Sequence, residues 1–159
     1  MVFCPMCLKD VPFQGEYSYL CHNCRYEFSL EDSIYTDVGF FRLVIAGSRG
    51  FKHYSFLKEK VDYLIHKRLE EGFVPIIISG MAKGADRIGA KYAKEREYVL
   101  KECPADWDTY GKSAGYRRNV EMADMADAVI VFWDGVSKGS DHMIQIAKDK
   151  GIPVKVINF

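Results

Sequence analysis

The stretch Arg42-Leu43-Val44-Ile45-Ala46-Gly47-Ser48-Arg49-Gly50-Phe51 decides the fold that we expect for this chain of 159 residues. An apolar, β-branched run that breaks into a small, glycine-flanked turn is typical of the first strand of a nucleotide-binding α/β domain. The sequence after this stretch alternates apolar runs with helical spacing, whereas the sequence before it carries four of the five cysteines. We therefore place a domain boundary just before this stretch.

Five apolar runs follow one another along the chain, and segments with helical spacing separate them. We predict strands at residues 43–46, 74–78, 98–100, 128–132 and 153–157, with helices at about 53–71, 86–96, 116–125 and 141–150. Strands that alternate with helices in this way form a parallel sheet with right-handed crossovers. The predicted fold class is α/β: a Rossmann-like parallel sheet of about five strands with helices on both faces, plus a small N-terminal zinc ribbon.

The N-terminal segment is built on two cysteine pairs, Cys-Pro-Met-Cys and Cys-His-Asn-Cys. Two such pairs a short loop apart are typical of a zinc site in a reducing compartment, and four thiolates leave no open position for catalysis. We predict a structural Zn²⁺ that staples a segment too short to bury a core. The predicted division is a zinc ribbon at 1–28, a connector at 29–40 and the α/β domain at 41–159. The metal ligands are Cys4, Cys7, Cys21 and Cys24.

Charge is balanced over the whole chain but unevenly distributed. Residues 1–40 hold two basic and six acidic residues, a net charge of −4, which leaves +4 for the remainder of a neutral chain. This small surplus suits a small anionic ligand and argues against a nucleic acid partner, for which a stronger basic stripe is typical. No apolar run is long enough to span a bilayer, and the start is unlike a signal peptide, so we expect a cytoplasmic protein without a membrane partner.

Small and polar residues follow the strands at the edge where ligands bind in parallel sheets. After the first strand, Gly47-Ser48-Arg49-Gly50 offers N–H groups, a hydroxyl and a guanidinium to an anion, although an ordinary tight turn has the same pattern. After the second, Ser79-Gly80-Met81-Ala82-Lys83-Gly84-Ala85-Asp86 adds a cation and a helix start, but neither a P-loop nor a dinucleotide fingerprint. Asp86 suits capping or holding a neighbouring loop.

Two further stretches complete the predicted pocket. In Gly115-Tyr116-Arg117-Arg118-Asn119 the two arginines point in different directions on a helix, so one faces the ligand and the other faces solvent. Asn119 suits either a ligand ribose or a tie between loops. In the stretch from Phe132 to Ser140, Trp133 suits either base stacking or packing. The candidate ligand-binding residues are Gly47, Ser48, Arg49, Ser79, Gly80, Lys83, Gly84, Arg117, Asn119, Trp133, Ser137, Gly139 and Ser140.

Taken in order, these motifs, together with Pro104-Ala105-Asp106-Trp107, resemble the YspA/YpsA-related branch of the SLOG superfamily, whose relatives include the Smf/DprA and LOG proteins. The resemblance covers residues 42–159. It implies a Rossmann-like fold that binds nucleotides or nucleotide-derived molecules such as ADP-ribose and NAD-related signals, and it implies a homodimer or a higher homo-oligomer.

The resemblance leaves catalysis open. LOG relatives hydrolyse the N-glycosidic bond of nucleoside monophosphates with an arginine and a glutamate beside a Pro-Gly-Gly-x-Gly-Thr loop. The equivalent Ser137-Lys138-Gly139-Ser140 has neither the proline nor the double glycine, and no glutamate follows it. The catalytic candidates are Glu121, Arg117 and Asp86. We predict a module that binds a nucleotide-derived ligand for sensing or sequestration; the alternatives are a hydrolase that cleaves an N-glycosidic or phosphoribosyl bond, and a nucleic-acid-binding protein.

Overall fold

The computed structural model describes residues 2–4, 6, 10–11, 19–21, 23–25, 27–28, 34–35 and 39–159. Within the first 35 residues it contains five two-residue strands: β1 (Val2–Phe3), β2 (Asp10–Val11), β3 (Tyr19–Leu20), β4 (Glu27–Phe28) and β5 (Ile34–Tyr35). They form an antiparallel sheet of order β2-β1-β5 and an antiparallel β3-β4 pair. Strand β5 falls within the predicted connector and pairs with β1. The division into 1–28, 29–40 and 41–159 stays a prediction.

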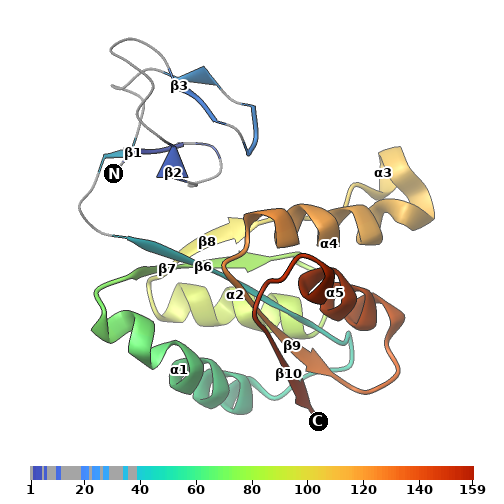
Figure 1. Cartoon of the computed structure of the whole chain (residues 1–159). Helices are drawn as coiled ribbons and strands as arrows, with labels where there is room; N and C mark the ends of the chain where they lie inside the picture. Colours follow the sequence, from blue (N-terminus) through green and yellow to red (C-terminus); the bar gives the residue numbers. More distant parts are fainter. Residues whose placement is uncertain are drawn as a thin grey trace.

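The main sheet has five strands in the order β10-β9-β6-β7-β8, and every neighbouring pair is parallel (Figure 1). This confirms the predicted α/β class. The strands are β6 (Phe40–Gly47), β7 (Val74–Ser79), β8 (Val99–Glu102), β9 (Ala128–Trp133) and β10 (Val154–Asn158). The stretch that opened the sequence analysis supplies β6, which lies at the centre and pairs with β7 and β9.

Helices cover both faces of this sheet, as the sequence predicts. The four long helices are α1 (Tyr54–Glu70), α2 (Ala85–Glu95), α4 (Ala114–Met125) and α5 (Lys138–Asp149). The α1 and α2 helices pack on one face, and α4 and α5 pack on the other. The longest of them, α1, has 17 residues, and none of the helices in the described part of the chain has the length and hydropathy that a bilayer crossing needs.

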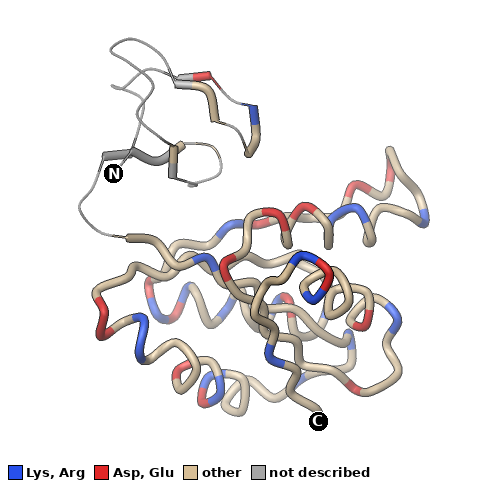
Figure 2. Tube along the Cα trace, viewed as in Figure 1, with Lys and Arg blue, Asp and Glu red and all other residues tan. Residues whose placement is uncertain are grey.

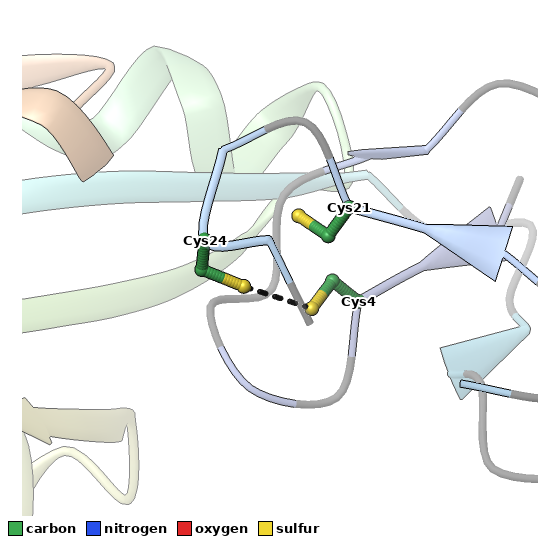
Figure 3. A group of neighbouring side chains, drawn as sticks. All are labelled: Cys4, Cys21 and Cys24. Carbon is green, nitrogen blue, oxygen red and sulfur yellow. Dashed lines mark hydrogen bonds between the residues drawn. The ribbon is translucent and has the colours of Figure 1, made fainter. Parts of the chain in front are cut away.

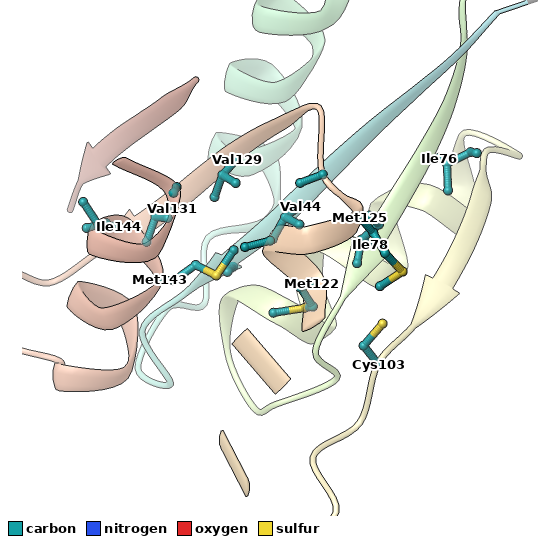
Figure 4. Packing of buried hydrophobic residues seen from close by; sticks show 14 residues of the cluster. Val44, Ile76, Ile78, Cys103, Met122, Met125, Val129, Val131, Met143 and Ile144 are labelled. Atoms are coloured by element: carbon teal, nitrogen blue, oxygen red, sulfur yellow. The ribbon is translucent and has the colours of Figure 1, made fainter. Parts of the chain in front are cut away.

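Strand β6 shows how one sequence serves both faces, because successive side chains on a strand point in opposite directions. Leu43 and Ile45 belong to the core under α1 and α2. Val44 belongs to the second core, where Met122 from α4 and Met143 from α5 meet the sheet (Figure 4). Charged residues lie mainly on helices and loops, with both signs interspersed over the α/β part (Figure 2).

The region between β8 and α4 holds a short helical turn, α3 (Trp107–Tyr110), followed by the 3₁₀ turn η1 (Gly111–Ser113). The sequence predicts only an irregular loop here. The carboxylate of Asp106 caps the turn by accepting a hydrogen bond from the N–H of Thr109 at 3.0 Å, a common stabiliser of helix starts. This α3-η1 segment becomes one wall of the site.

Candidate functional site

A cavity of about 390 Å³ opens at the edge of the sheet where β6 and β9 end. Its walls come from the loop after β6, the loop after β7, the α3-η1 segment, the start of α4 and the start of α5. This is the place where ligands bind in open parallel sheets, and the volume lies in the range of small-molecule sites. Seven of the predicted ligand residues line this cavity: Gly47, Ser48, Arg49, Asn119, Ser137, Gly139 and Ser140.

Two glycines let the loops of this edge approach one another. A Cβ on Gly47 would lie 2.1 Å from the carbonyl oxygen of Phe132, and a Cβ on Gly84 would lie 2.4 Å from the carbonyl oxygen of Ser48. Gly84 also has φ +91°, a conformation that side chains with a Cβ rarely adopt. The N–H of Ser48 in turn donates to Phe132 at 2.8 Å. Both glycines therefore serve loop packing.

Serine hydroxyls gather beside the first turn of α5. The Ser137 hydroxyl donates to Oγ of Ser48 at 2.9 Å, and Oγ of Ser140 lies 3.5 Å from Oγ of Ser48. The carboxylate of Asp134 accepts hydrogen bonds from the backbone N–H groups of Ser137 and Val136, which lowers the pKa of Asp134 to about 2. A helix N-terminus with hydroxyl donors around it favours an anion.

A buried charge pair forms another part of the cavity wall. The Arg118 guanidinium is 3.7 Å from Oδ2 of Asp86, and the two side chains are 12% and 5% exposed. Burial raises the pKa of Asp86 to about 6, although Arg118 and the backbone N–H groups of Ala82 and Gly47 favour the charged form. Because Gly47 ends β6 and Ala82 lies in the loop after β7, Asp86 joins the end of β6 to that loop.

Asn119 ties α4 to the start of α5. Its Nδ2 donates to the carbonyl oxygen of Gly139 at 3.1 Å, and its Oδ1 accepts from Nε of Arg118 at 3.2 Å. Asn119 is 5% exposed. These bonds make Asn119 a tie between the helices, while its role as a ligand contact stays a prediction, since it also lines the cavity.

Several predicted residues lie outside this cavity wall. The Arg117 guanidinium stacks 4.4 Å above the centre of the Tyr110 ring, and the cavity is lined by Arg118 instead. The indole N–H of Trp133 donates to the carbonyl oxygen of Ser137 at 3.1 Å, and its ring packs on the core. Glu121 is exposed and lies outside the lining.

Ser79 supports the loop after β7 from beneath. It is fully buried, and its hydroxyl donates to the carbonyl oxygen of Asp86 at 2.8 Å while accepting from the N–H of Met81 at 3.1 Å. The hydroxyl therefore acts inside the protein, where a ligand has no access.

A second hollow, of about 660 Å³, adjoins the first and is strongly basic. The predicted residues Gly80 and Lys83 line it, as does Arg87, which the sequence analysis did not single out. The two hollows share four lining residues: Arg49, Ala82, Trp107 and Arg118. Four residues that line the first cavity are not among the predicted ligand residues, although they lie in or near the sequence motifs: Trp107, Lys112, Tyr116 and Lys138.

Comparison with known proteins agrees with this architecture. Residues 41–110 match the family model described as "YspA, cpYpsA-related SLOG family". The chain is also 35% identical over 124 residues to the Gene 61 protein of Mycobacterium phage D29, an alignment that covers 74% of this chain and 95% of the phage protein. The chain belongs to the YspA, cpYpsA-related SLOG family. The resemblance seen in the sequence is thus confirmed.

Solved structures place this SLOG-family chain among proteins of the same fold. It superposes on DNA processing protein A from Streptococcus pneumoniae with a TM-score of 0.55 at 20% identity, covering 74% of this chain and 50% of that one. DNA processing protein A from Helicobacter pylori gives a TM-score of 0.47 at 22% identity, covering 76% and 66%. The chain therefore spans half of the length of the first of these structures.

The prediction against a nucleic acid partner is wrong. The structural neighbour from S. pneumoniae, with a TM-score of 0.55, is a DNA processing protein. The prediction relied on net charge, which sums over all faces of a molecule. Here the two hollows concentrate cations at one edge of a neutral chain: Arg49, Lys83, Arg87, Lys112, Arg118 and Lys138.

The N-terminal segment of this SLOG-family chain gathers three thiols (Figure 3). The Sγ atoms of Cys4, Cys21 and Cys24 all lie within 4.8 Å of one another, and those of Cys4 and Cys24 are 3.5 Å apart. In a tetrahedral thiolate site with metal–sulfur bonds of about 2.3 Å, neighbouring sulfurs lie roughly 3.8 Å apart. The three thiols therefore have a spacing that fits a metal ion. Cys7, the fourth predicted ligand, is outside the described residues.

Proposed function

We propose that this SLOG-family protein binds a nucleotide or a nucleotide-derived ligand, such as ADP-ribose or an NAD-related molecule, for sensing or sequestration. The observation that carries the proposal is the composition of the first cavity. Hydroxyls, the start of α5 and the guanidinium groups of Arg49 and Arg118 all line it. A phosphate in this cavity has several donors within the lining, and charge-assisted donors bind phosphate strongly.

The hydrogen bonds and positions of the nearby carboxylates support binding without hydrolysis. Among the described residues, the acidic side chains that line the cavity are Asp86 and Asp134. Each already accepts backbone N–H hydrogen bonds that fix its loop. Glu121, the other candidate base, is exposed and outside the lining. A general base needs hydrogen-bond reach to the proton that it removes, and these three side chains are otherwise engaged or distant.

Isothermal titration calorimetry with AMP, ADP-ribose and NAD tests the proposal. Arg49 is exposed and lines both hollows, so Arg49→Ala removes a phosphate donor with little effect on folding. We expect its affinity to fall about tenfold or more, because a hydrogen bond to a charged group contributes about 1.5–3 kcal/mol. The matched control is Arg68→Ala, at a surface ion pair with Glu71 on α1.

Two outcomes would contradict the proposal. The first is that none of the three nucleotides binds, and the second is that Arg49→Ala and Arg68→Ala bind them equally well. Chromatography of the recovered nucleotide separates binding from hydrolysis. Intact nucleotide after long incubation supports sensing or sequestration, whereas free base or ribose phosphate would establish the hydrolase alternative.

Single-stranded DNA binding is a second candidate, favoured by the surface of α3 and α4. Three aromatic side chains are exposed there, Trp107 at 50%, Tyr110 at 47% and Tyr116 at 44%. Lys112 follows Tyr110 along the chain, and Arg117 follows Tyr116, with its guanidinium 4.4 Å above the Tyr110 ring. Exposed rings that bases stack on, beside cations that follow the backbone, are the usual means of binding single strands. A labelled oligothymidylate measured at 50 and 200 mM salt tests it, since phosphate contacts make affinity fall steeply with salt.

For the N-terminal segment we propose a structural Zn²⁺. Thiolates at tetrahedral spacing select zinc among the common divalent ions of the cell, and a metal compensates for a small core. Cys4 and Cys21 are buried, as ligands of a closed site are. The zinc content of the purified chain, measured by plasma mass spectrometry, tests the assignment, and one equivalent is expected.

A further inference from the structure

Trp107 is the most exposed of the aromatic residues that line the cavity. It begins α3, and half of its surface is open to solvent. One edge of the indole ring lies over Gly115, where a Cβ would be 3.4 Å from Cη2 of Trp107. The ring therefore contacts the start of α4 along one edge, while half of its surface is open to a ligand.

The chain's other tryptophan has the opposite environment. Trp133 ends β9, packs against the core and uses its indole N–H in a hydrogen bond to Ser137. The sequence made Trp133 the candidate for stacking, but its ring is engaged by the protein. Of the two tryptophans, Trp107 is the one that lines the cavity and has a solvent-exposed ring.

The position of Trp107 relative to the cations defines what it can bind. It lines both hollows, and so do Arg49 and Arg118. A ligand phosphate held by these guanidinium groups places the rest of the ligand in hollows that Trp107 also lines. A planar aromatic base stacks favourably on such a ring, whereas a sugar phosphate without a base gains nothing from it.

We propose that Trp107 is the stacking platform for the nucleobase of the ligand, which restricts the ligand class to phosphates that carry an aromatic base. The inference rests on the proposed nucleotide binding and adds a specificity residue to it. The base comes from a free nucleotide or from a single strand, and the same chemistry serves both.

Fluorescence titration tests the platform directly. Trp133→Phe leaves Trp107 as the single tryptophan of the chain, which contains two. The variant is titrated with AMP, with ribose 5-phosphate and with a short oligothymidylate, and stacking of a base quenches the indole emission. We expect AMP to quench it and ribose 5-phosphate to bind without quenching.

Affinities measured by calorimetry give a second readout. Replacing an aromatic platform by alanine weakens base binding by about tenfold or more. We therefore expect Trp107→Ala to lower the affinity for AMP by this factor and to leave the affinity for ribose 5-phosphate within twofold of the wild-type value. Trp107→Phe retains a ring and recovers part of the loss. The Trp133→Phe protein, which also loses the indole hydrogen bond to Ser137, is measured with AMP beside the wild type and is the reference for the fluorescence titration.

The possible outcomes distinguish a failure of the stacking proposal from a failure of the proposed nucleotide site. Equal effects of Trp107→Ala on AMP and ribose 5-phosphate, or binding of AMP without quenching, would overturn the platform while the phosphate site stands. Failure of both AMP and ribose 5-phosphate to bind would instead reject the proposed nucleotide site. Quenching by oligothymidylate, when AMP neither binds nor quenches, supports the platform and identifies a strand as the source of the base.

Discussion

Replacing Arg118 by methionine should destabilise the folded protein by an amount that grows with pH. Arg118 lies 3.7 Å from the carboxylate of Asp86, and both side chains are almost buried. Methionine keeps the apolar stem and removes the charge. The pKa of Asp86 is about 6 in the folded protein against 3.8 in an unfolded chain. The free energy of unfolding of the wild type therefore contains a contribution that is full below pH about 4 and is lost as the pH rises through about 6.

The size of the effect follows from that pKa. An opposite charge at this distance lowers a carboxyl pKa by about 1–3 pH units, each equivalent to about 1.4 kcal/mol. Without Arg118 the pKa of Asp86 rises further, so at pH 8 the variant loses an additional amount of about 1.3–2.7 kcal/mol, the upper value being the whole ionisation free energy of a carboxyl with a pKa of about 6 at that pH. At pH 5 the carboxyl is mostly protonated in both folded proteins, and only the hydrogen bonds to Gly80 and Asn119 are lost, about 1–2 kcal/mol.

Urea unfolding followed by circular dichroism at pH 5 and pH 8 measures both values. The control is Lys150→Met, which removes an exposed ion pair with Asp124 whose side chains are 38% and 49% exposed and should cost less than about 1 kcal/mol at either pH. In a second variant, Asp86→Asn is added to Arg118→Met, and the additional loss at pH 8 should disappear. The reasoning is refuted if Arg118→Met loses the same free energy at both pH values, or if the double variant keeps the pH dependence.

Three further outcomes are expected. Gly84→Ala should lower the melting temperature more than Gly72→Ala, because both residues have positive φ but an added Cβ meets backbone only at Gly84; equal shifts would show that the loops there do not need the close approach. Ser79→Ala should cost about 1–3 kcal/mol in urea unfolding through the loss of a buried hydroxyl with two partners, and an unchanged midpoint would contradict this. Cys21→Ser should lower the metal content of the purified chain, whereas Cys103→Ser, at a buried position in the α/β core, should leave it unchanged; metal loss in the second variant would disprove the assignment.

The course of the chain could be predicted because its signals are local. Runs such as Leu43 to Ala46 are apolar without interruption, and only strands buried on both faces need that pattern. Once strands and helices alternate, right-handed crossovers place every strand's carboxyl end at one edge. The loops after β6 and β9 were therefore expected to meet, and they do: Ser48 and Ser137 share a hydrogen bond across 89 positions of sequence.

The identity of the side chains that face the cavity was decided by the tertiary structure. Neighbouring residues on a helix point about 100° apart, so whether Arg117 or Arg118 faces inward depends on how α4 packs on the sheet. The choice between the two tryptophans depends likewise on the short α3 turn, which leaves Trp107 at the rim, and on the end of β9, which buries part of Trp133. The sequence alone determined the fold and the edge at which the site forms, because hydrophobic periodicity is a local property that can be read along the chain. Only the packed structure determined which charges and rings reach that site, because their directions are set by contacts between distant segments.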